Sequence, residues 1–269
     1  MKNSLHFLHN LLPFKGLGSA FLELLLPRGC AGCRENWPVS AESCWCDVCR
    51  EKLPWIRSPI CPVCGRPFQK SPGSGDHLCG DCELSTYSFD SARSAAFHSG
   101  VARDGVHRLK FGGHLHWVPP LVELLETVLT DEMKQRIDLI VPVPLHVRRL
   151  RQRGFNQAAL LARELGRRLE IPVHCAVLFR RIWTEPQTRL NREERLHNVK
   201  GAFVVLRPAD IKGKKTLLID DVFTTGSTLC ECAGALKEAE AAEVHALTVS
   251  RSLPDWRPDA SLQDLDDSQ

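Results

Sequence analysis

The chain has 269 residues, of which 43% are hydrophobic and 25% are charged, and its formal net charge is +3. This composition is typical of a globular protein with one core domain and a smaller module. No apolar run is long enough to span a bilayer, so we expect no membrane span. The charge is unevenly distributed: residues 148–200 hold 13 Lys and Arg against 5 Asp and Glu, a local charge of +8, so the remainder carries −5. This middle segment therefore predicts a polyanionic ligand.

The first 26 residues form an N-terminal extension that is apolar in places and interrupted by proline, glycine and charged residues. Arg28 and Gly29, just before Cys30, do not resemble the small-residue cleavage site of a signal peptide. We therefore expect a cytoplasmic protein whose extension packs either on the protein itself or on a partner.

Residues 27–86 form a cysteine-rich module with four C-x-x-C pairs and too few aliphatic residues for a core of its own. Two such pairs complete the tetrahedral shell of one zinc ion, so the module predicts two structural Zn²⁺ sites. Proximity in the sequence gives one site from Cys30, Cys33, Cys46 and Cys49 and another from Cys61, Cys64, Cys79 and Cys82. An interleaved cross-brace and a redox or disulfide role are the alternatives, and Cys44 could replace Cys46 as a ligand.

The next part of the chain, residues 87–252, predicts an α/β domain. We expect a strand at 91–97 and helices at 101–111 and 118–129. Strands and helices then alternate, which is typical of a mostly parallel sheet flanked by helices. The expected elements are strands at 138–143, 173–179, 216–220 and 244–250, and helices at 155–169 and after Ser227. Residues 253–269 carry five Asp and predict a disordered acidic tail.

A basic loop, residues 142–157, follows the strand at 138–143. His146 and the guanidinium groups of four arginines could bind oxyanions here; the arginines are Arg148, Arg149, Arg151 and Arg153. The alternative for each arginine alone is a solvated charge at the start of a helix.

A second long basic segment, residues 184–203, lies between two core strands. Long loops at this position in α/β enzymes often close over a substrate. A short surface helix at 192–199 is the alternative.

The most informative stretch is LLIDDVFTTGST, residues 217–228. Asp220 and Asp221 follow a short apolar run and should lie at the edge of the sheet where ligands of α/β proteins bind. The residues after them can wrap N–H groups and hydroxyls around a phosphate at the start of a helix; they are Thr224, Thr225, Gly226, Ser227 and Thr228. The alternative is a buried strand that ends in an ordinary turn.

This spacing resembles the 5-phosphoribosyl-1-pyrophosphate (PRPP) motif of the type I phosphoribosyltransferases, except that Thr216 stands at the first apolar position. The resemblance implies that Asp220 and Asp221 hold the ribose hydroxyls and that the loop at 224–228 holds the 5′-phosphate. It also implies that the basic loop, with Arg149 and His146, binds pyrophosphate, and that Mg²⁺ bridges the ribose and the pyrophosphate. The resemblance also places the mobile hood of that superfamily at residues 184–203, with Gln187, Arg192, Arg195 and Asn198 as its candidate contacts.

The combined motifs resemble the ComF/GntX family, which is linked to DNA uptake and utilisation. They are the four cysteine pairs, LKFGG at 109–113, VPVPLHVRRLRQRGFNQ at 141–157, PQTRLNREERLHNVKGAF at 186–203 and the acidic stretch above. The resemblance implies a phosphoribosyltransferase-like protein that binds PRPP, with an unidentified acceptor. The alternatives are a non-catalytic PRPP or nucleotide sensor, an adapter that binds single-stranded DNA, and a zinc module that contacts proteins of a DNA-uptake machine. The sequence does not predict the oligomeric state.

Overall fold

The computed structural model describes residues 28–37, 43–69, 75–84, 87–183 and 201–253. The chain divides into two compact units, Met1–Glu51 and Lys52–Gln269. The first holds a small antiparallel pair, β1 (Arg28–Gly29) and β2 (Asn36–Trp37), and the helix α2 (Asp47–Glu51). The four-part division predicted from the sequence, with boundaries after residues 26, 86 and 252, stays a prediction.

The second unit is built on a four-stranded sheet in which every neighbouring pair is parallel. The strands are β3 (Ser91–Phe97), β4 (Leu139–Pro142), β7 (Lys215–Phe223) and β8 (Glu243–Arg251), in the order β3-β8-β7-β4. All four strands therefore end at the same edge of the sheet. This confirms the predicted parallel α/β architecture.

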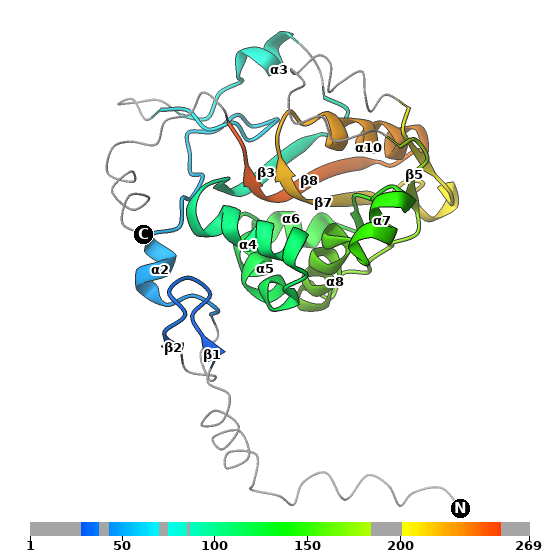
Figure 1. Cartoon of the computed structure of the whole chain (residues 1–269). Helices are drawn as coiled ribbons and strands as arrows, with labels where there is room; N and C mark the ends of the chain where they lie inside the picture. The colour runs from blue at the N-terminus through cyan, green and yellow to red at the C-terminus, as the bar shows by residue number, and fades with distance from the viewer. Residues whose placement is uncertain (1–27, 38–42, 70–74, 85–86, 184–200, 254–269) are drawn as a thin grey trace, which may run out of the picture. The chain divides into compact units, whose positions relative to one another are not determined.

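Helices cover both faces of this sheet (Figure 1). The helices α4 (Gly100–Gly112), α5 (Val118–Glu126) and α8 (Gln157–Leu169) contact one face, and α10 (Ser227–Glu238) contacts the other. The predicted apolar face of α10, with Leu229, Ala233 and Leu236, is fully buried. The shorter helices are α3 (Gly80–Leu84), α6 (Asp131–Arg136), α7 (Val147–Arg153), η1 (Leu115–Trp117) and η2 (Pro208–Asp210).

The predicted strand at 173–179 is wrong in position and partner. Val173 makes a single parallel bridge to Ile140, and a turn at 175–177 then takes the chain out of the main sheet. The strand β5 (Leu178–Arg180) pairs antiparallel with β6 (Phe203–Val205) in a separate sheet. An apolar run shows that a segment is buried, but it does not show which strand it pairs with.

The predicted basic loop at 142–157 contains a helix, α7. Nδ1 of His146 accepts the N–H of Arg148 at 3.2 Å and caps the start of this helix. Gly154 ends it in the left-handed conformation, φ 83°, and donates its N–H to the carbonyl of Leu150. The arginines of this segment are therefore held on a helical turn and its flanks.

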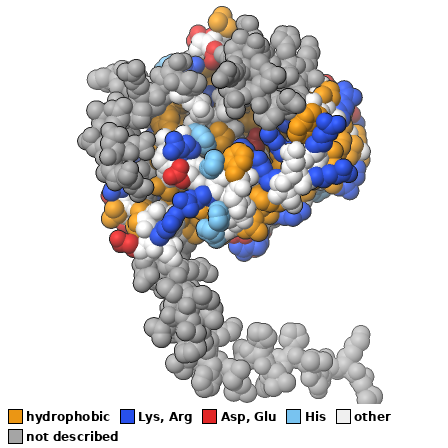
Figure 2. Space-filling model, in the orientation of Figure 1, with side chains coloured by type: hydrophobic (Ala, Val, Ile, Leu, Met, Phe, Trp, Pro, Cys, Tyr) orange, Lys and Arg blue, Asp and Glu red, His pale blue; other side chains and the backbone are white. Residues whose placement is uncertain are grey.

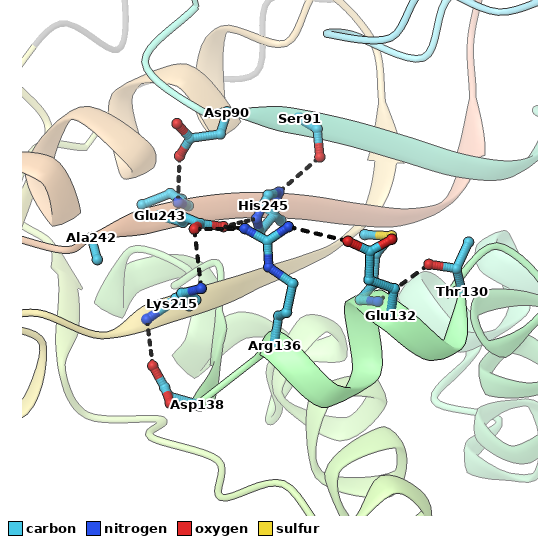
Figure 3. A network of polar contacts seen from close by, with 12 residues as sticks. Asp90, Ser91, Thr130, Glu132, Arg136, Asp138, Lys215, Ala242, Glu243 and His245 are labelled. Carbon is cyan, nitrogen blue, oxygen red and sulfur yellow. Dashed lines mark hydrogen bonds and ion pairs between the residues drawn. The ribbon is translucent and has the colours of Figure 1, made fainter.

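A network of charged residues ties the strands together at their N-terminal edge (Figure 3). The carboxylate of Glu243 accepts from Arg136 at 2.8 Å, from Lys215 at 3.2 Å and from His245 at 3.0 Å. These hydrogen bonds lower the pKa of Glu243 to about 2. Because the partners come from α6, β7 and β8, the network fixes the strand ends that lie opposite the predicted ligand edge. Among the described residues, no helix combines the length and apolar character that a membrane crossing requires.

Candidate functional site

The two adjacent acids lie within β7 rather than at its end. The strand continues to Phe223 because it keeps pairing with β8, whereas β4 stops at Pro142, opposite Ile219. Asp220 and Asp221 therefore lie just beyond the C-terminal end of β4. The prediction that the acids lie at the edge of the sheet is therefore correct on the β4 side of β7. The prediction that the strand ends at the acids is wrong, because β7 continues to Phe223.

The acids differ in environment. Asp221 is buried, and its carboxylate oxygens lie 3.0 and 3.3 Å from Nζ of Lys110. Asp220 is half-buried and accepts the backbone N–H of Asp221 at 2.9 Å. Burial and the charge of Asp221 raise the pKa of Asp220 to about 7, against the opposing effect of Lys110. Asp220 therefore titrates near neutral pH, and a bound cation or hydroxyl donor would favour its ionised form.

Sequence reasoning missed Lys110 as a site residue. It comes from the last turn of α4, where a lysine is normally explained by the helix dipole, although the LKFGG motif had marked the segment. His98 lies close by, and its Nδ1 contacts Oγ of Ser250 at 2.8 Å. Burial and the charge of Lys110 lower the pKa of His98, so this ring is neutral at pH 7. Lys110 thus brings a cation into direct contact with Asp221.

The loop after the acids leads directly into the start of a helix, as the sequence predicts. Gly226 takes φ 80°, and α10 begins at Ser227. The hydroxyls of Thr225 and Ser227 lie 2.7 Å apart, and the N–H of Ser227 donates to Oγ1 of Thr225 at 3.4 Å. A methyl group at Gly226 would lie 2.7 Å from Cζ of Phe223, so only glycine fits. The first turn of a twelve-residue helix thus faces the end of β7.

The RGFNQ sequence positions one arginine toward the acids. Arg153 donates to Oε1 of Gln157, and its guanidinium lies 5.4 Å from the ring of Phe111. Burial lowers the pKa of Arg153, while the charges of Asp221 and Asp220 raise it. Asn156 caps α8 and also donates to the carbonyl of Val143 at 3.0 Å, which fixes this turn against the end of β4.

The other end of α7 carries an aromatic contact. The ring of His146 lies 5.1 Å from that of Trp183, and the guanidinium of Arg148 lies 5.8 Å from Trp183. Burial, Arg148 and Arg180 lower the pKa of His146, so a neutral ring caps the helix. Arg148 and Arg151 are exposed and Arg149 is half-buried. Figure 2 shows Lys and Arg side chains gathered on the face that carries α7 in Figure 1.

Arg180 is a second basic residue that sequence reasoning missed. It lies on β5, its guanidinium is 5.4 Å from the ring of Phe203, and burial lowers its pKa while the charge of Asp220 raises it. No local motif marks it. Gln187, Arg192, Arg195 and Asn198 lie outside the described residues.

The cysteines gather into two sets of four, as their proximity in the sequence predicts. The sulfur atoms of Cys30, Cys33, Cys46 and Cys49, and those of Cys61, Cys64, Cys79 and Cys82, lie within 4.8 Å of one another in each set. A tetrahedral zinc–thiolate site places sulfurs about 3.8 Å apart, and Cys64 and Cys79 are 3.6 Å apart while Cys33 and Cys46 are 4.0 Å apart. Cys44 belongs to neither set, and the interleaved cross-brace is not formed.

The surroundings of the sulfurs also suit a metal. Burial opposes ionisation of Cys61, yet N–H groups of Cys64, Cys79 and Val63 outweigh it and lower its pKa to about 7. In the first set, the N–H of Cys46 donates to the sulfur of Cys30 at 3.2 Å. Four sulfurs at tetrahedral spacing in each set, with N–H donors directed at Cys30 and Cys61, fit two structural zinc ions.

Comparisons with known proteins agree with both parts. Residues 21–83 match the model of the double zinc ribbon domain, and residues 150–263 match that of the phosphoribosyl transferase domain. Among solved structures, an orotate phosphoribosyltransferase from Aeropyrum pernix is 19% identical, with a TM-score of 0.33, over 52% of this chain and 62% of that chain. The parallel α/β fold and the two family models thus define a phosphoribosyltransferase-like protein with a double zinc ribbon.

Three relatives cover most of the chain. Competence protein ComFC of Bacillus subtilis (strain 168) is 33% identical over 77% of this chain and 84% of its own length. Competence protein F of Haemophilus influenzae is 29% identical over 83% and 96%, and DNA utilization protein YhgH of Escherichia coli (strain K12) is 31% identical over 78% and 97%. The chain belongs to the ComF/GntX family.

Proposed function

We propose that the second unit binds PRPP with Mg²⁺ at the end of β7 and transfers its phosphoribosyl group with release of pyrophosphate. The observation that carries the proposal is the placement of an acid pair next to a phosphate-type loop on one strand, at the ligand edge of a parallel sheet. An ordinary turn that caps the start of α10 would explain the glycine at position 226. It would not explain two adjacent acids, one of which, Asp221, is buried and paired with Lys110.

Each group has a role in this proposal. Asp220 and Asp221 accept hydrogen bonds from the ribose hydroxyls, and their charge favours the positive character that develops at C1 when its bond to pyrophosphate breaks. The residues Thr224 to Thr228 donate N–H and O–H groups to the 5′-phosphate. Bound Mg²⁺ would neutralise charge between the ribose and the pyrophosphate.

The leaving group also needs positive charge on the protein. We assign this role to the arginines of α7, among them Arg153, whose pKa responds to the charges of Asp221 and Asp220. The neutral ring of His146, whose Nδ1 accepts the N–H of Arg148, can add a hydrogen bond from its Nε2–H. The pyrophosphate leaves with the electron pair of the C1–O bond, and an acceptor nucleophile forms the new bond to C1. The acceptor is not identified by any described residue, and Gln187 remains a candidate contact.

The names of the relatives concern competence and DNA utilization. We infer the same association for this chain, including contacts with DNA-uptake proteins. Thiolate zinc sites persist in a reducing compartment, which supports a cytoplasmic location. A second candidate function, binding of single-stranded DNA, is favoured by two arginine–aromatic contacts on α7, Arg148 with Trp183 and Arg153 with Phe111.

The test is isothermal titration of PRPP with Mg²⁺ into the zinc-loaded full chain, followed by single-stranded DNA in the same cell. We expect binding by the wild type, loss of binding when Asp220→Asn and Asp221→Asn are combined, and unchanged zinc content in that variant. Glu240→Gln is the matched control, because Glu240 is paired with Lys212 at the surface. Equal PRPP affinity in the double variant would refute the site, and binding of DNA alone would favour the second candidate.

A further inference from the structure

The second cysteine set is part of the core of the phosphoribosyltransferase unit. Cys61, Cys64 and Cys79 are buried in the same hydrophobic cluster as Phe223 and Leu229. The turn that carries Cys64 rests directly on β3. The N–H of Ala92 donates to the carbonyl of Val63 at 2.7 Å. A zinc ion in this set therefore holds a turn that packs on the central sheet.

One arginine links this turn to the last residues of the sheet. Arg251 ends β8, and only 4% of its surface is exposed. Its Nη1 donates to the carbonyl oxygen of Cys64 at 2.6 Å, and its Nη2 lies 3.8 Å from the sulfur of Cys64. The guanidinium therefore contacts both the backbone carbonyl and the sulfur of Cys64, a ligand of the second zinc site.

The face of the same guanidinium lies against the strand that carries the acids. It is 4.0 Å from the ring centroid of Phe223, the last residue of β7 and the register partner of Arg251. The chain after Arg251 is also held there, because the N–H of Ser252 donates to the carbonyl of Phe223 at 2.8 Å. A buried stack of this kind is stronger than the same contact at the surface.

Phe223 in turn supports the phosphate-type loop. Its Cζ would lie 2.7 Å from a methyl group at Gly226, so the ring and the backbone of Gly226 are in close contact. A path of direct contacts therefore runs from Cys64 through Arg251 and Phe223 to Gly226. None of these contacts belongs to the acids, to Lys110 or to α7.

We propose that Arg251 is a positioning residue that couples the second zinc site to the loop at 224–228, so that zinc occupancy and phosphate binding favour each other. When zinc holds Cys64, the guanidinium of Arg251 stays hydrogen-bonded to the carbonyl of Cys64 and stacked on the ring of Phe223. When the zinc leaves, the turn at Cys64 relaxes, and the guanidinium loses the contact that orients it. The part of this inference that concerns ligand affinity rests on the proposed function, whereas the part that concerns the order of the loop does not.

The first arm of the test uses no ligand. Hydrogen–deuterium exchange of the zinc-loaded full chain is compared between the wild type, Arg251→Met, Arg251→Lys and the control Arg66→Met. Arg66 lies next to the same cysteine turn, but it pairs with Asp81 at 3.3 Å and is 41% exposed. We expect about tenfold faster exchange in residues 222–232 of Arg251→Met, an intermediate rate in Arg251→Lys, and the wild-type rate in Arg66→Met. Zinc content is measured in every sample.

The second arm uses the wild type alone, so it stands even if Arg251→Met does not fold. Two-way coupling requires that PRPP with Mg²⁺ slow the removal of one of the two zinc ions by a chelator. Equal exchange in the Arg251 and Arg66 methionine variants would overturn the inference. So would PRPP binding that leaves zinc removal unchanged. Failure of the wild type to bind PRPP would overturn the proposed function, while the exchange arm would still judge the coupling.

Discussion

Gly226 provides the sharpest test of how the loop at 224–228 is built. Its φ of 80° costs an L residue about 1–2 kcal/mol. Replacement of glycine by alanine also restricts the unfolded chain, which returns about 0.4–1 kcal/mol. At a left-handed position in open space the net cost is therefore about 0–1.6 kcal/mol.

At Gly226 a steric cost is added. The new methyl group would lie 2.7 Å from Cζ of Phe223 and 3.1 Å from Cε1 of Tyr87, where carbon atoms normally stay about 3.5–4.0 Å apart. Phe223 is buried, and its ring packs edge-on against Phe89 at 6.4 Å, so it has little room to move. Overpacking of this kind costs about 1–3 kcal/mol. Gly226→Ala should thus lower the free energy of unfolding by about 1–5 kcal/mol, which is about 1–3 kcal/mol more than the same change in open space.

Gly213→Ala is the matched control, because Gly213 has a similar φ of 70° and no heavy atom within 4 Å of the new methyl group. Both variants are unfolded with urea in zinc-containing buffer and followed by far-ultraviolet circular dichroism. The contribution of the first unit is the same in both proteins and cancels in their difference. If Gly226→Ala is no less stable than Gly213→Ala, the tight contact between the loop and Phe223 does not exist in solution.

Three further predictions concern charge and metal. The folded pKa of Asp220, about 7, is above its ordinary value of 3.8, so its contribution to stability is present below pH about 4 and is lost as the pH rises through 7. Asp220→Asn should melt higher than the wild type at pH 8, and a thermal scan should show the gap narrowing toward pH 5; a constant gap would contradict the raised pKa. For Glu243 the folded pKa of about 2 is below the ordinary 4.5, so its contribution is present above pH 4.5 and is lost as the pH falls toward 2. Glu243→Gln should lower the free energy of unfolding by about 1–2 kcal/mol at pH 7 and by almost nothing near pH 2, and an equal loss at both pH values would refute the assignment. Combined Cys61→Ser and Cys64→Ser should remove about one zinc ion and destabilise the protein by several kcal/mol, as metal analysis and urea unfolding will show; full zinc retention would show that the ligands are wrongly grouped.

Local sequence patterns predicted correctly those elements whose structure depends on residues close together in the sequence. The strand predicted at 91–97 has the bounds of β3, and the helix predicted after Ser227 is α10. In both cases the apolar period and the flanking turn residues decide the outcome within a few residues. The two cysteine sets were predictable for the same reason, since each C-x-x-C turn brings its own sulfurs together.

The helix α7 shows where a local signal was misread. Its run of Arg, Leu and Gln has good helix propensity, and His146 and Gly154 supply the caps. The density of charge suggested a loop because exposed basic residues are common there. A helix of seven residues on the surface can carry the same charge, since only a few of its side chains need to pack.

The residues missed at the site are those brought in by topology. Lys110 meets Asp221 across 111 positions of the sequence, and Arg251 meets Cys64 across 187. Neither partner can be found from spacing, because each contact exists only once the parallel strands have aligned their C-terminal ends. The order β3-β8-β7-β4 places the last residue of β8 beside the last residue of β7. The strand alignment that places Asp220 beyond the end of β4 therefore also brings Arg251 between Cys64 and Phe223, which is why the loop at 224–228 and the second zinc site should respond to each other.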